Sequence, residues 1–406
     1  MKRDYSSIKD FCVHQSELSK AAIDEFLMYF IAAKAGLDKT IKKAERKYAH
    51  LIYDMPDAYF STISAQFVVG KALAKGGYFS QYRNDAALNT LGEAEREFLN
   101  FQLEHPWRYT FARITSFPAE DFYILTDEIS GDDLLVYSPG ISREVEDGNG
   151  ASLYLLLLWY NGKCWQTFGL ISAFRSFDIE DFYIFGTEVS VSVEDDESFM
   201  KSVYDDPFPY FMLFTTKEVP LIKNGEHVMR HHVGEYSVQN FDAEQFNEEF
   251  TVEWNKGVYR VTSGAWSNHP HFGAVYYAER RRLLYLHALT AEGYDRMSKS
   301  LIDLGLPVEP DADYTVGLAM AHVMSLVLGR AITFNPFEKW FPETVSPNQN
   351  SESSPGSEGV QRFMTLLLPV FNAAKEPDLV AMAAESGIEL ETAMSIYTTL
   401  LEKYRK

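Results

Sequence analysis

The chain has 406 residues, of which 46% are hydrophobic, 15% are aromatic and 23% are charged. This apolar content can fill more than one core, which excludes a largely disordered protein and predicts two or three domains. The 58 acidic and 37 basic side chains give a net charge of −21. We therefore expect an acidic, soluble globular protein.

The sequence also predicts where the protein resides. Its two cysteines, Cys12 and Cys164, are too few for a disulfide framework, which is typical of a reducing compartment. The first residues lack the apolar core and cleavage site of a signal peptide. The longest weakly polar stretch, residues 314–328, is shorter than the roughly 20 residues that span a bilayer. We predict a cytoplasmic protein without a membrane span.

The negative charge is concentrated in the middle of the chain. Residues 107–260 carry 27 Asp or Glu and 11 Lys or Arg, whereas residues 1–106 carry 14 of each. Such an acidic segment repels nucleic acid and anionic membranes. It is either a surface that maintains solubility or a docking face for a basic partner.

Residues 1–105 are predicted to form a helical domain. Apolar residues recur every three or four positions from Leu18, with Ser16 as the candidate N-cap, and Gly36 ends this helix. Asp38 can cap the next helix, whose surface carries five basic residues: Lys39, Lys42, Lys43, Arg46 and Lys47. We expect these side chains to be solvated; contact with the acidic middle of the chain, or with RNA, is the alternative.

Residues 106–289 are predicted to be mainly antiparallel sheet, because they are rich in aromatic and β-branched residues between turns. Residues 153–160 are apolar on both faces, and Asn161-Gly162 is a strong hairpin signal before a returning strand. Further hairpin turns are expected at residues 255–257 and 279–281. The sheet is expected to close as a sandwich or a partly open barrel.

An internal repeat lies within this region. Residues 116–130 align without gaps to residues 176–190, and nine of the fifteen positions are identical. The period of sixty residues exceeds that of most solenoids and predicts a duplicated sheet in which both copies supply strands. The shared motif contains two carboxylate pairs: Glu120, Asp121, Glu180 and Asp181. They could hold a divalent metal or act as a general acid and base, or they could simply cap the entry of each strand.

Helices are predicted again in residues 290–345. Thr290 is a candidate N-cap, and a buried helix over residues 314–328 is expected to begin at Asp313. Residues 346–359 are rich in Ser, Pro, Gly and Asn and are predicted to be a flexible linker.

The last segment, residues 360–406, is predicted to be a small helical module. Ala383 precedes Gly387 by four residues, and Ile388 and Ile396 stand where a helix-turn-helix has apolar anchors. The second helix would begin with acidic residues, which disfavours contact with DNA at that end. A docking or packing module is therefore the first interpretation.

Histidines provide a second candidate metal site. His227 and His231 are four residues apart, and His269 and His271 are two residues apart beside a proline. Either spacing can place two imidazoles on one ion, but neither comes with the Glu of a metalloprotease motif. Solvated or hydrogen-bonded histidines are the alternative interpretation.

The fold class that these patterns predict is α+β, with an N-terminal helical domain, a central duplicated antiparallel sheet and C-terminal helices. No nucleophile elbow, P-loop or dinucleotide fingerprint is present in the sequence. The first functional hypothesis is a non-catalytic interaction or regulatory protein with a protein partner and no cofactor. The alternatives are a metal-dependent hydrolase that uses the His and carboxylate groups, and a nucleic-acid-associated protein. The oligomeric state is left open.

Overall fold

The computed structural model describes most of the chain, and it divides into two compact units, residues 1–341 and 342–406. The described residues are 4–53, 55–56, 58–146, 153–216, 222–224, 227–246, 248–330, 332, 334, 363, 366–367, 377–390, 392–394 and 396–398. Helices and antiparallel strands are both abundant, which confirms the predicted α+β class. The predicted linker, residues 346–359, lies outside the described residues.

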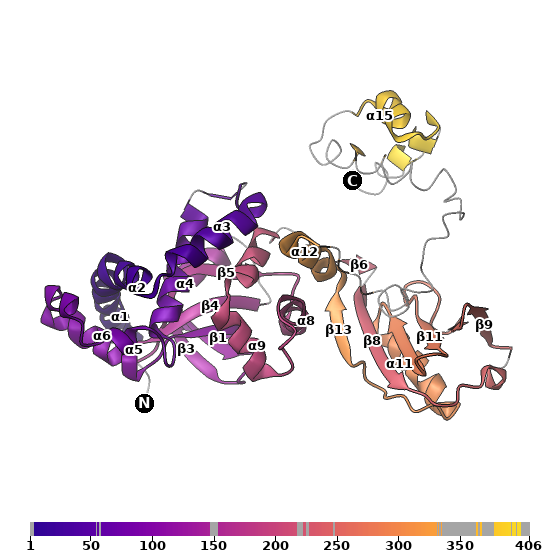
Figure 1. Cartoon of the computed structure of the whole chain (residues 1–406), viewed down its shortest axis with the longest axis horizontal. Coiled ribbons are helices and arrows are strands. Elements are labelled where there is room, and N and C mark those ends of the chain that lie inside the picture. The colour runs from indigo at the N-terminus through magenta and orange to yellow at the C-terminus, as the bar shows by residue number, and fades with distance from the viewer. Residues whose placement is uncertain are drawn as a thin grey trace. The chain divides into compact units, whose positions relative to one another are not determined.

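The chain begins with a long helical stretch (Figure 1). Helix α1 (Tyr5–Ser19) continues through a π-helical segment η1 (Lys20–Leu27) into α2 (Met28–Ala35), which ends at Gly36 with φ 66° as predicted. The prediction that Ser16 caps this helix is wrong. Asp4 is the N-cap, because its carboxylate accepts the backbone N–H of Ser7 at 3.3 Å.

Four more helices complete the predicted helical segment: α3 (Asp38–Ile52), α4 (Ala58–Leu73), the short α5 (Phe79–Tyr82) and α6 (Glu93–Glu104), with a 3-10 turn η2 (Ala86–Thr90) before α6. The prediction that Asp38 caps α3 is wrong, since Asp38 is the first residue of the helix and Leu37 is at the N-cap position. The five basic residues predicted on α3 are all exposed. By contrast, α4 is buried on nearly every side, and it contacts α2, α3 and the following barrel.

Five strands form a closed barrel after α6: β1 (Arg108–Ala119), β2 (Phe122–Asp127), β3 (Asp133–Tyr137), β4 (Leu153–Tyr160) and β5 (Trp165–Phe174). Their order around the barrel is β1-β2-β3-β5-β4, and β1 also pairs with β4. All pairs are antiparallel except β3 with β5, and α7 (Pro139–Glu146) connects β3 to β4. This connectivity is the topology of the OB fold, a five-stranded Greek-key barrel.

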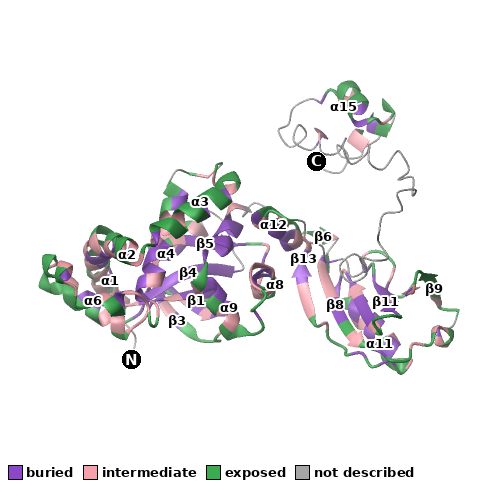
Figure 2. Ribbon diagram, viewed as in Figure 1, coloured by how far each residue is buried: buried purple, intermediate pink, exposed green. Residues whose placement is uncertain are grey.

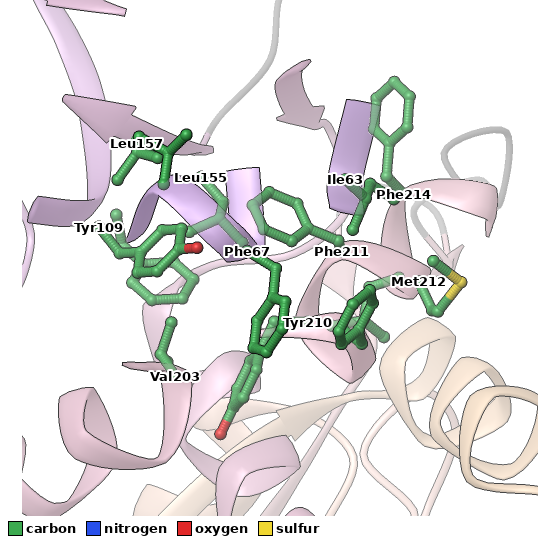
Figure 3. Packing of buried hydrophobic residues seen from close by; sticks show 14 of the residues in the cluster. Ile63, Phe67, Tyr109, Leu155, Leu157, Val203, Tyr210, Phe211, Met212 and Phe214 are labelled. Carbon is green, nitrogen blue, oxygen red and sulfur yellow. The ribbon is translucent and has the colours of Figure 1, made fainter. Parts of the chain in front are cut away.

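Strand β4 is buried on both faces, as its apolar run predicts. Leu155 and Leu157 belong to the core that the barrel shares with the helices, whereas Leu156 and Leu158 belong to the barrel interior. Successive side chains of a strand point to opposite faces, so one strand supplies two cores. Figure 3 shows side chains of α4, β1 and β4, together with Val203, Tyr210 and Phe211 from later helices, pointing toward one another in the shared core.

A helical segment follows the barrel: α8 (Ile179–Val189), α9 (Asp196–Asp205), α10 (Phe208–Met212) and the 3-10 turn η3 (Leu213–Thr216). The prediction that residues 176–190 form a strand is therefore wrong, although residues 116–119 and 122–127 of the first copy are strands. Asp178 and Asp181 form a capping box that begins α8. The first copy has Pro118 where the second has Asp178, and proline has no side-chain acceptor with which to cap a helix.

The second sheet has six strands in the order β13-β8-β12-β11-β10-β9. Its strands are β8 (Arg230–Ser237), β9 (Phe250–Asn255), β10 (Val258–Ser263), β11 (Ala274–Ala278), β12 (Leu283–Ala288) and β13 (Tyr314–Gly317). Beside them lie a two-stranded ribbon, β6 (Lys223–Asn224) with β7 (His227–Val228), and the 3-10 turn η4 (Ala243–Gln245). The β9–β10 and β11–β12 pairings confirm the two predicted hairpin turns.

Two helices follow strands of this sheet in the sequence, one after β12 and one after β13. Helix α11 (Ala291–Asp303) begins as predicted at Thr290, whose Oγ1 accepts the backbone N–H of Gly293 at 3.0 Å. The helix predicted over residues 314–328 is shorter, since Tyr314–Gly317 is strand β13 and α12 (Leu318–Leu328) follows it. Asp313 does not cap a helix; it accepts the backbone N–H of Glu235 at 2.6 Å and so holds β13 beside β8.

The unit of residues 342–406 contains α15 (Leu379–Ser386), which ends at Gly387 with φ 69°. Phe363, Leu367, Ala383 and Ala393 are buried together, and Ile388 and Ile396 pack against them. These are the small residue, the turn glycine and the apolar anchors that the sequence indicates. Figure 2 shows the exposed residues on the outer side of α15.

The shared core leads to a stability prediction. Phe67 on α4 is only 2% exposed and its ring lies 4.9 Å from that of Phe208. Replacing Phe67 with Ala leaves a cavity and should lower the free energy of unfolding by about 3–5 kcal/mol, measured by urea denaturation. The matched control is Phe117→Ala, because Phe117 is 63% exposed. An equal effect of both variants would contradict the shared core.

Candidate functional site

The first carboxylate pair of the repeat binds a lysine of α1. Glu120 and Asp121 form the short turn between β1 and β2, where Asp121 has φ 63°. Lys9 Nζ lies 2.8 Å from Asp121 Oδ2 and 3.0 Å from Glu120 Oε2. These hydrogen bonds, that to Asp121 first, raise the pKa of Lys9 above its ordinary value. The pair therefore connects α1 to the barrel.

The second pair binds an arginine of the six-stranded sheet. Arg230 on β8 contacts Asp178, Glu180 and Asp181 at 2.6, 3.4 and 3.2 Å. Asp181 is fully buried and also accepts the backbone N–H of Gly317 at 2.7 Å. Burial raises the pKa of Asp181 to about 6. The two pairs have different partners, so the structure does not bring the four carboxylates into one site.

The Arg230 cluster carries a second stability prediction. Removing the guanidinium by Arg230→Gln leaves the buried carboxylate of Asp181 without its charge partner, which should cost about 3–5 kcal/mol of unfolding free energy. The control is Arg260→Gln, since the Arg260–Glu253 pair at 2.8 Å is exposed on both sides and should cost about 1 kcal/mol or less. Urea denaturation at pH 7 measures both. A loss below 1 kcal/mol for Arg230→Gln would show that the cluster does not hold the sheet to α8.

Two of the candidate histidines lie close together, since the ring centroids of His227 and His271 are 6.1 Å apart, whereas His231 lies elsewhere. His231 Nδ1 is 2.8 Å from Nε2 of His287, not near His227, which is exposed on β7. His271 is buried, and its Nδ1 lies 2.7 Å from Oγ1 of the helix cap Thr290. The ring of His269 instead contacts the side-chain amide of Asn224. Among the described residues, no three His, Cys, Asp or Glu side chains are grouped so that they could hold a metal ion.

The histidines of β8 and β12 are strongly affected by burial. It lowers the pKa of His231 and of His232 to about 4, and that of His287 to about 3. Electrostatic repulsion adds to this, from Arg230 on His232 and from His231 and His232 on His287. The folded protein therefore holds these rings neutral where an exposed histidine would bind a proton.

This arrangement makes stability depend on pH. Below the ordinary histidine pKa of about 6.5, the unfolded chain binds protons that the folded chain excludes, so the unfolding free energy falls as the pH falls. Asp181 acts in the opposite direction, because its pKa is raised. Between pH 6.5 and 5, the unfolding free energy of His287→Gln should fall less steeply than that of the unmodified chain. The two slopes should differ by up to about 1.4 kcal/mol per pH unit. Urea titrations at each pH measure the difference between the unfolding free energies of the two proteins. Asp181 contributes equally to both proteins, so its effect cancels in this difference. Parallel curves would contradict the neutral state of His287.

A groove lined by both apolar and charged side chains lies where α4 ends against β1 and α9. Its volume is about 1020 Å³. Tyr78, Ile129, Met200 and Tyr204 are half-buried and form its apolar wall. The charged side chains are Lys71, Lys75, Arg108, Asp196, Glu197, Lys201 and Asp205. Four cations and three carboxylates thus line a groove in a protein that is strongly acidic as a whole.

The local sequence explains why this groove is open. Gly70 lies where α4 crosses β1, and a Cβ at this position would be 2.6 Å from Tyr109 Oη. The Tyr109 hydroxyl donates to the carbonyl of Gln66 at 3.0 Å, and the backbone N–H of Trp107 donates to Leu73 at 3.0 Å. These bonds fix the end of α4 on the first residues of β1. Gly76, with φ 72°, then turns the chain away and leaves the groove between them.

The charges of the groove differ in their pairing. Lys71 Nζ is 3.8 Å from Asp205, and burial lowers the pKa of Lys71. Lys201 also pairs with Asp205, and Arg108 pairs with Asp127 beneath the groove. Lys75, Asp196 and Glu197 are exposed and form no ion pair within the described part of the chain. As far as the described residues extend, one cation and two carboxylates of the groove are therefore free to pair with a ligand.

A second potential binding surface, on the barrel, is already covered. OB-fold barrels bind oligonucleotides on strands 2 and 3 and on the loops between strands 1 and 2 and between strands 4 and 5. In this protein α1 lies on these elements. Tyr5 packs on Phe122 of β2 with ring centroids 5.1 Å apart, and Lys9 binds the first of the two loops. Cys12 contacts Cys164 in the second loop.

Neither the groove nor the covered face is evident from the sequence. Lys75, Met200 and Tyr204 belong to no motif, and they come from segments more than a hundred residues apart. These residues come together because α9 packs against β1.

No family model, curated protein or solved structure matches the chain. In the described part of the chain, no helix has both the length and the apolar character needed to cross a membrane.

Proposed function

We propose that this is a non-catalytic interaction protein, and that the groove between α4, β1 and α9 binds a polypeptide segment of a protein partner. The observation that supports this proposal is a large groove with an apolar wall and free charges of both signs at its edge. The expected ligand has an apolar anchor residue with an acidic side chain on one side and a basic side chain on the other.

The chemistry of the lining favours a polypeptide over other ligands. An apolar wall of Tyr78, Met200 and Tyr204 suits a buried anchor side chain, since aromatic and methionine side chains are enriched in interface cores. Lys75 can pair with a carboxylate, and Asp196 or Glu197 with a basic side chain. A dense polyanion such as nucleic acid would meet Asp196, Glu197 and Asp205, which would repel its phosphates.

The two alternative functions receive less support. Among the described residues, the histidines and carboxylates that a metal-dependent hydrolase would use are not grouped as a metal site. Asp121 binds Lys9, Asp181 binds Arg230, and His231 pairs with His287. A nucleic-acid ligand would have to displace α1 from the barrel or approach the acidic residues that follow Gly387. The five basic residues of α3 remain a candidate contact surface, but they lie on the exposed side of a single helix.

Selection of peptides tests the proposal directly. A phage library of random twelve-residue peptides is selected on the immobilised full-length protein, and the enriched peptides are measured by fluorescence polarisation. We expect peptides with an apolar residue between an acid and a base. Lys75→Glu should weaken their binding by about tenfold, or 1.4 kcal/mol, and exchanging the peptide's acid for lysine should restore it. Met200→Asp should weaken binding through the apolar wall.

The matched control is Lys39→Glu, which makes the same charge reversal at an exposed position of α3 outside the groove. Its peptide affinity should equal that of the unmodified protein. Enriched peptides whose affinity is unchanged by both Lys75→Glu and Met200→Asp would overturn the proposal, and so would a selection that enriches no peptide.

A further inference from the structure

We propose that Cys12 and Cys164 form a redox-active dithiol that closes to a disulfide when it meets a hydroperoxide, and that this bond locks α1 onto the barrel. The two sulfur atoms are 3.4 Å apart, although the residues are 152 positions apart in sequence. They are the only cysteines of the chain. The inference concerns a different site from the groove and does not depend on the proposed function.

The geometry of the pair is close to that of a disulfide. Cys12 is 0% exposed on the inner side of α1, and Cys164 is 1% exposed at the beginning of β5. A disulfide requires a sulfur separation of about 2.05 Å. The two atoms must therefore approach by a little more than 1 Å, which a rotation of the two side chains and a small shift of α1 can supply.

The surroundings of Cys12 stabilise a thiolate on that residue. Asn161 Nδ2 donates to Cys12 Sγ at 3.2 Å, and the Cys164 thiol is placed to donate to the same sulfur. Lys163 lies over the ring of Phe11, with Nζ 4.2 Å from the ring centroid, beside Cys12. Hydrogen bonding from Cys164, together with Asn161 and the charge of Lys163, lowers the pKa of Cys12. Donation to Cys12 raises the pKa of Cys164.

The turn that holds Cys164 is itself well ordered. Asn161 Oδ1 accepts the backbone N–H of Lys163 at 2.8 Å and that of Cys164 at 2.9 Å. Gln166 Nε2 donates to the Cys12 carbonyl at 3.3 Å and to Ser16 Oγ at 2.9 Å. The loop between β4 and β5 therefore fixes both sulfur atoms and the helix that carries one of them.

The chemistry balances with hydrogen peroxide as the oxidant. The Cys12 thiolate attacks one peroxide oxygen, the O–O bond breaks, and the leaving hydroxide takes up a proton to become water. Cys12 is then a sulfenic acid. The Cys164 sulfur attacks the Cys12 sulfur, the S–O bond breaks, and the hydroxyl leaves as water with the Cys164 proton. Two thiols are oxidised to one disulfide while one peroxide is reduced to two molecules of water.

Because both sulfur atoms are buried, the peroxide reaches Cys12 through a brief local opening beside α1 that keeps the hydrogen bonds from Asn161 and Cys164 to Cys12. The disulfide then prevents α1 from separating from the barrel. It joins α1 to the loop between β4 and β5, next to the Lys9 contacts with the loop between β1 and β2. In the oxidised protein, α1 would stay fixed on the face by which OB-fold barrels bind ligands.

Oxidation of the purified, reduced full-length chain with hydrogen peroxide tests the inference. We expect both thiols to be lost from the folded monomer, an intact mass lower by two hydrogen atoms, and one cross-linked peptide that contains Cys12 and Cys164. The Tm should rise on oxidation and return after treatment with dithiothreitol. Hydrogen exchange of the α1 amides should slow in the oxidised protein.

Variants separate this pair from ordinary cysteine oxidation. Cys164→Ala should stop oxidation at a sulfenic acid on Cys12, without a rise in Tm, and Cys12→Ser should leave Cys164 as a thiol. Lys163→Gln should slow disulfide formation several-fold and shift its pH profile to higher pH. Lys39→Gln, which removes a lysine far from the pair in sequence, should do neither.

Three results would overturn the inference. The first is a folded chain that keeps both thiols although hydrogen peroxide has oxidised a separate control peptide with an exposed cysteine in the same sample. The second is a disulfide that forms only between two chains. The third is over-oxidation of Cys12 while Cys164 remains a thiol in the unmodified protein.

Discussion

The first unit depends on a strand that is buried on both of its faces. β4 supplies Leu156 and Leu158 to the barrel interior and Leu155 and Leu157 to the core under α4 and α10. Because side chains alternate along a strand, the barrel cannot bury its outer surface without the helices. The helices and the barrel are therefore cooperative parts of one structure, and the groove at the end of α4 is a product of that packing.

Buried and half-buried ion pairs connect the remaining elements. The Glu-Asp pair of each repeat copy contacts one cation from a distant segment, Lys9 in the first copy and Arg230 in the second. Both copies therefore attach their own element to a distant segment of the chain, although the two copies form different secondary structures. An unpaired Asp181 would be costly in its buried position, so the contact fixes which element can lie beside α8. Acidic residues that suggest a metal site from sequence alone serve here as docking points.

The covered barrel face gives a physical basis for the proposed function. An exposed OB-type face would suggest a nucleic-acid ligand, but α1 occupies it through Lys9, Tyr5 and Cys12. The groove beside Lys75 and Met200 is on another part of the unit and remains open. The acidic middle of the chain, which repels polyanions, contributes to both the covered face and the groove. Its charge is thus compatible with a polypeptide ligand of mixed charge.

Turns and helix caps could be predicted from the sequence alone, whereas the contacts between distant residues depend on tertiary packing. Asn161-Gly162, Thr290, Gly36 and Gly387 define turns and caps through bonds to near neighbours, so they could be predicted. The motif shared by residues 116–130 and 176–190 could not be assigned from its identity, because a capping box at Asp178 and the packing of Phe182 favour a helix where Pro118 does not. The groove, the Arg230 cluster and the Cys12–Cys164 pair join segments up to 152 residues apart. No local pattern encodes such contacts, because they form only when segments that are far apart in the sequence pack together.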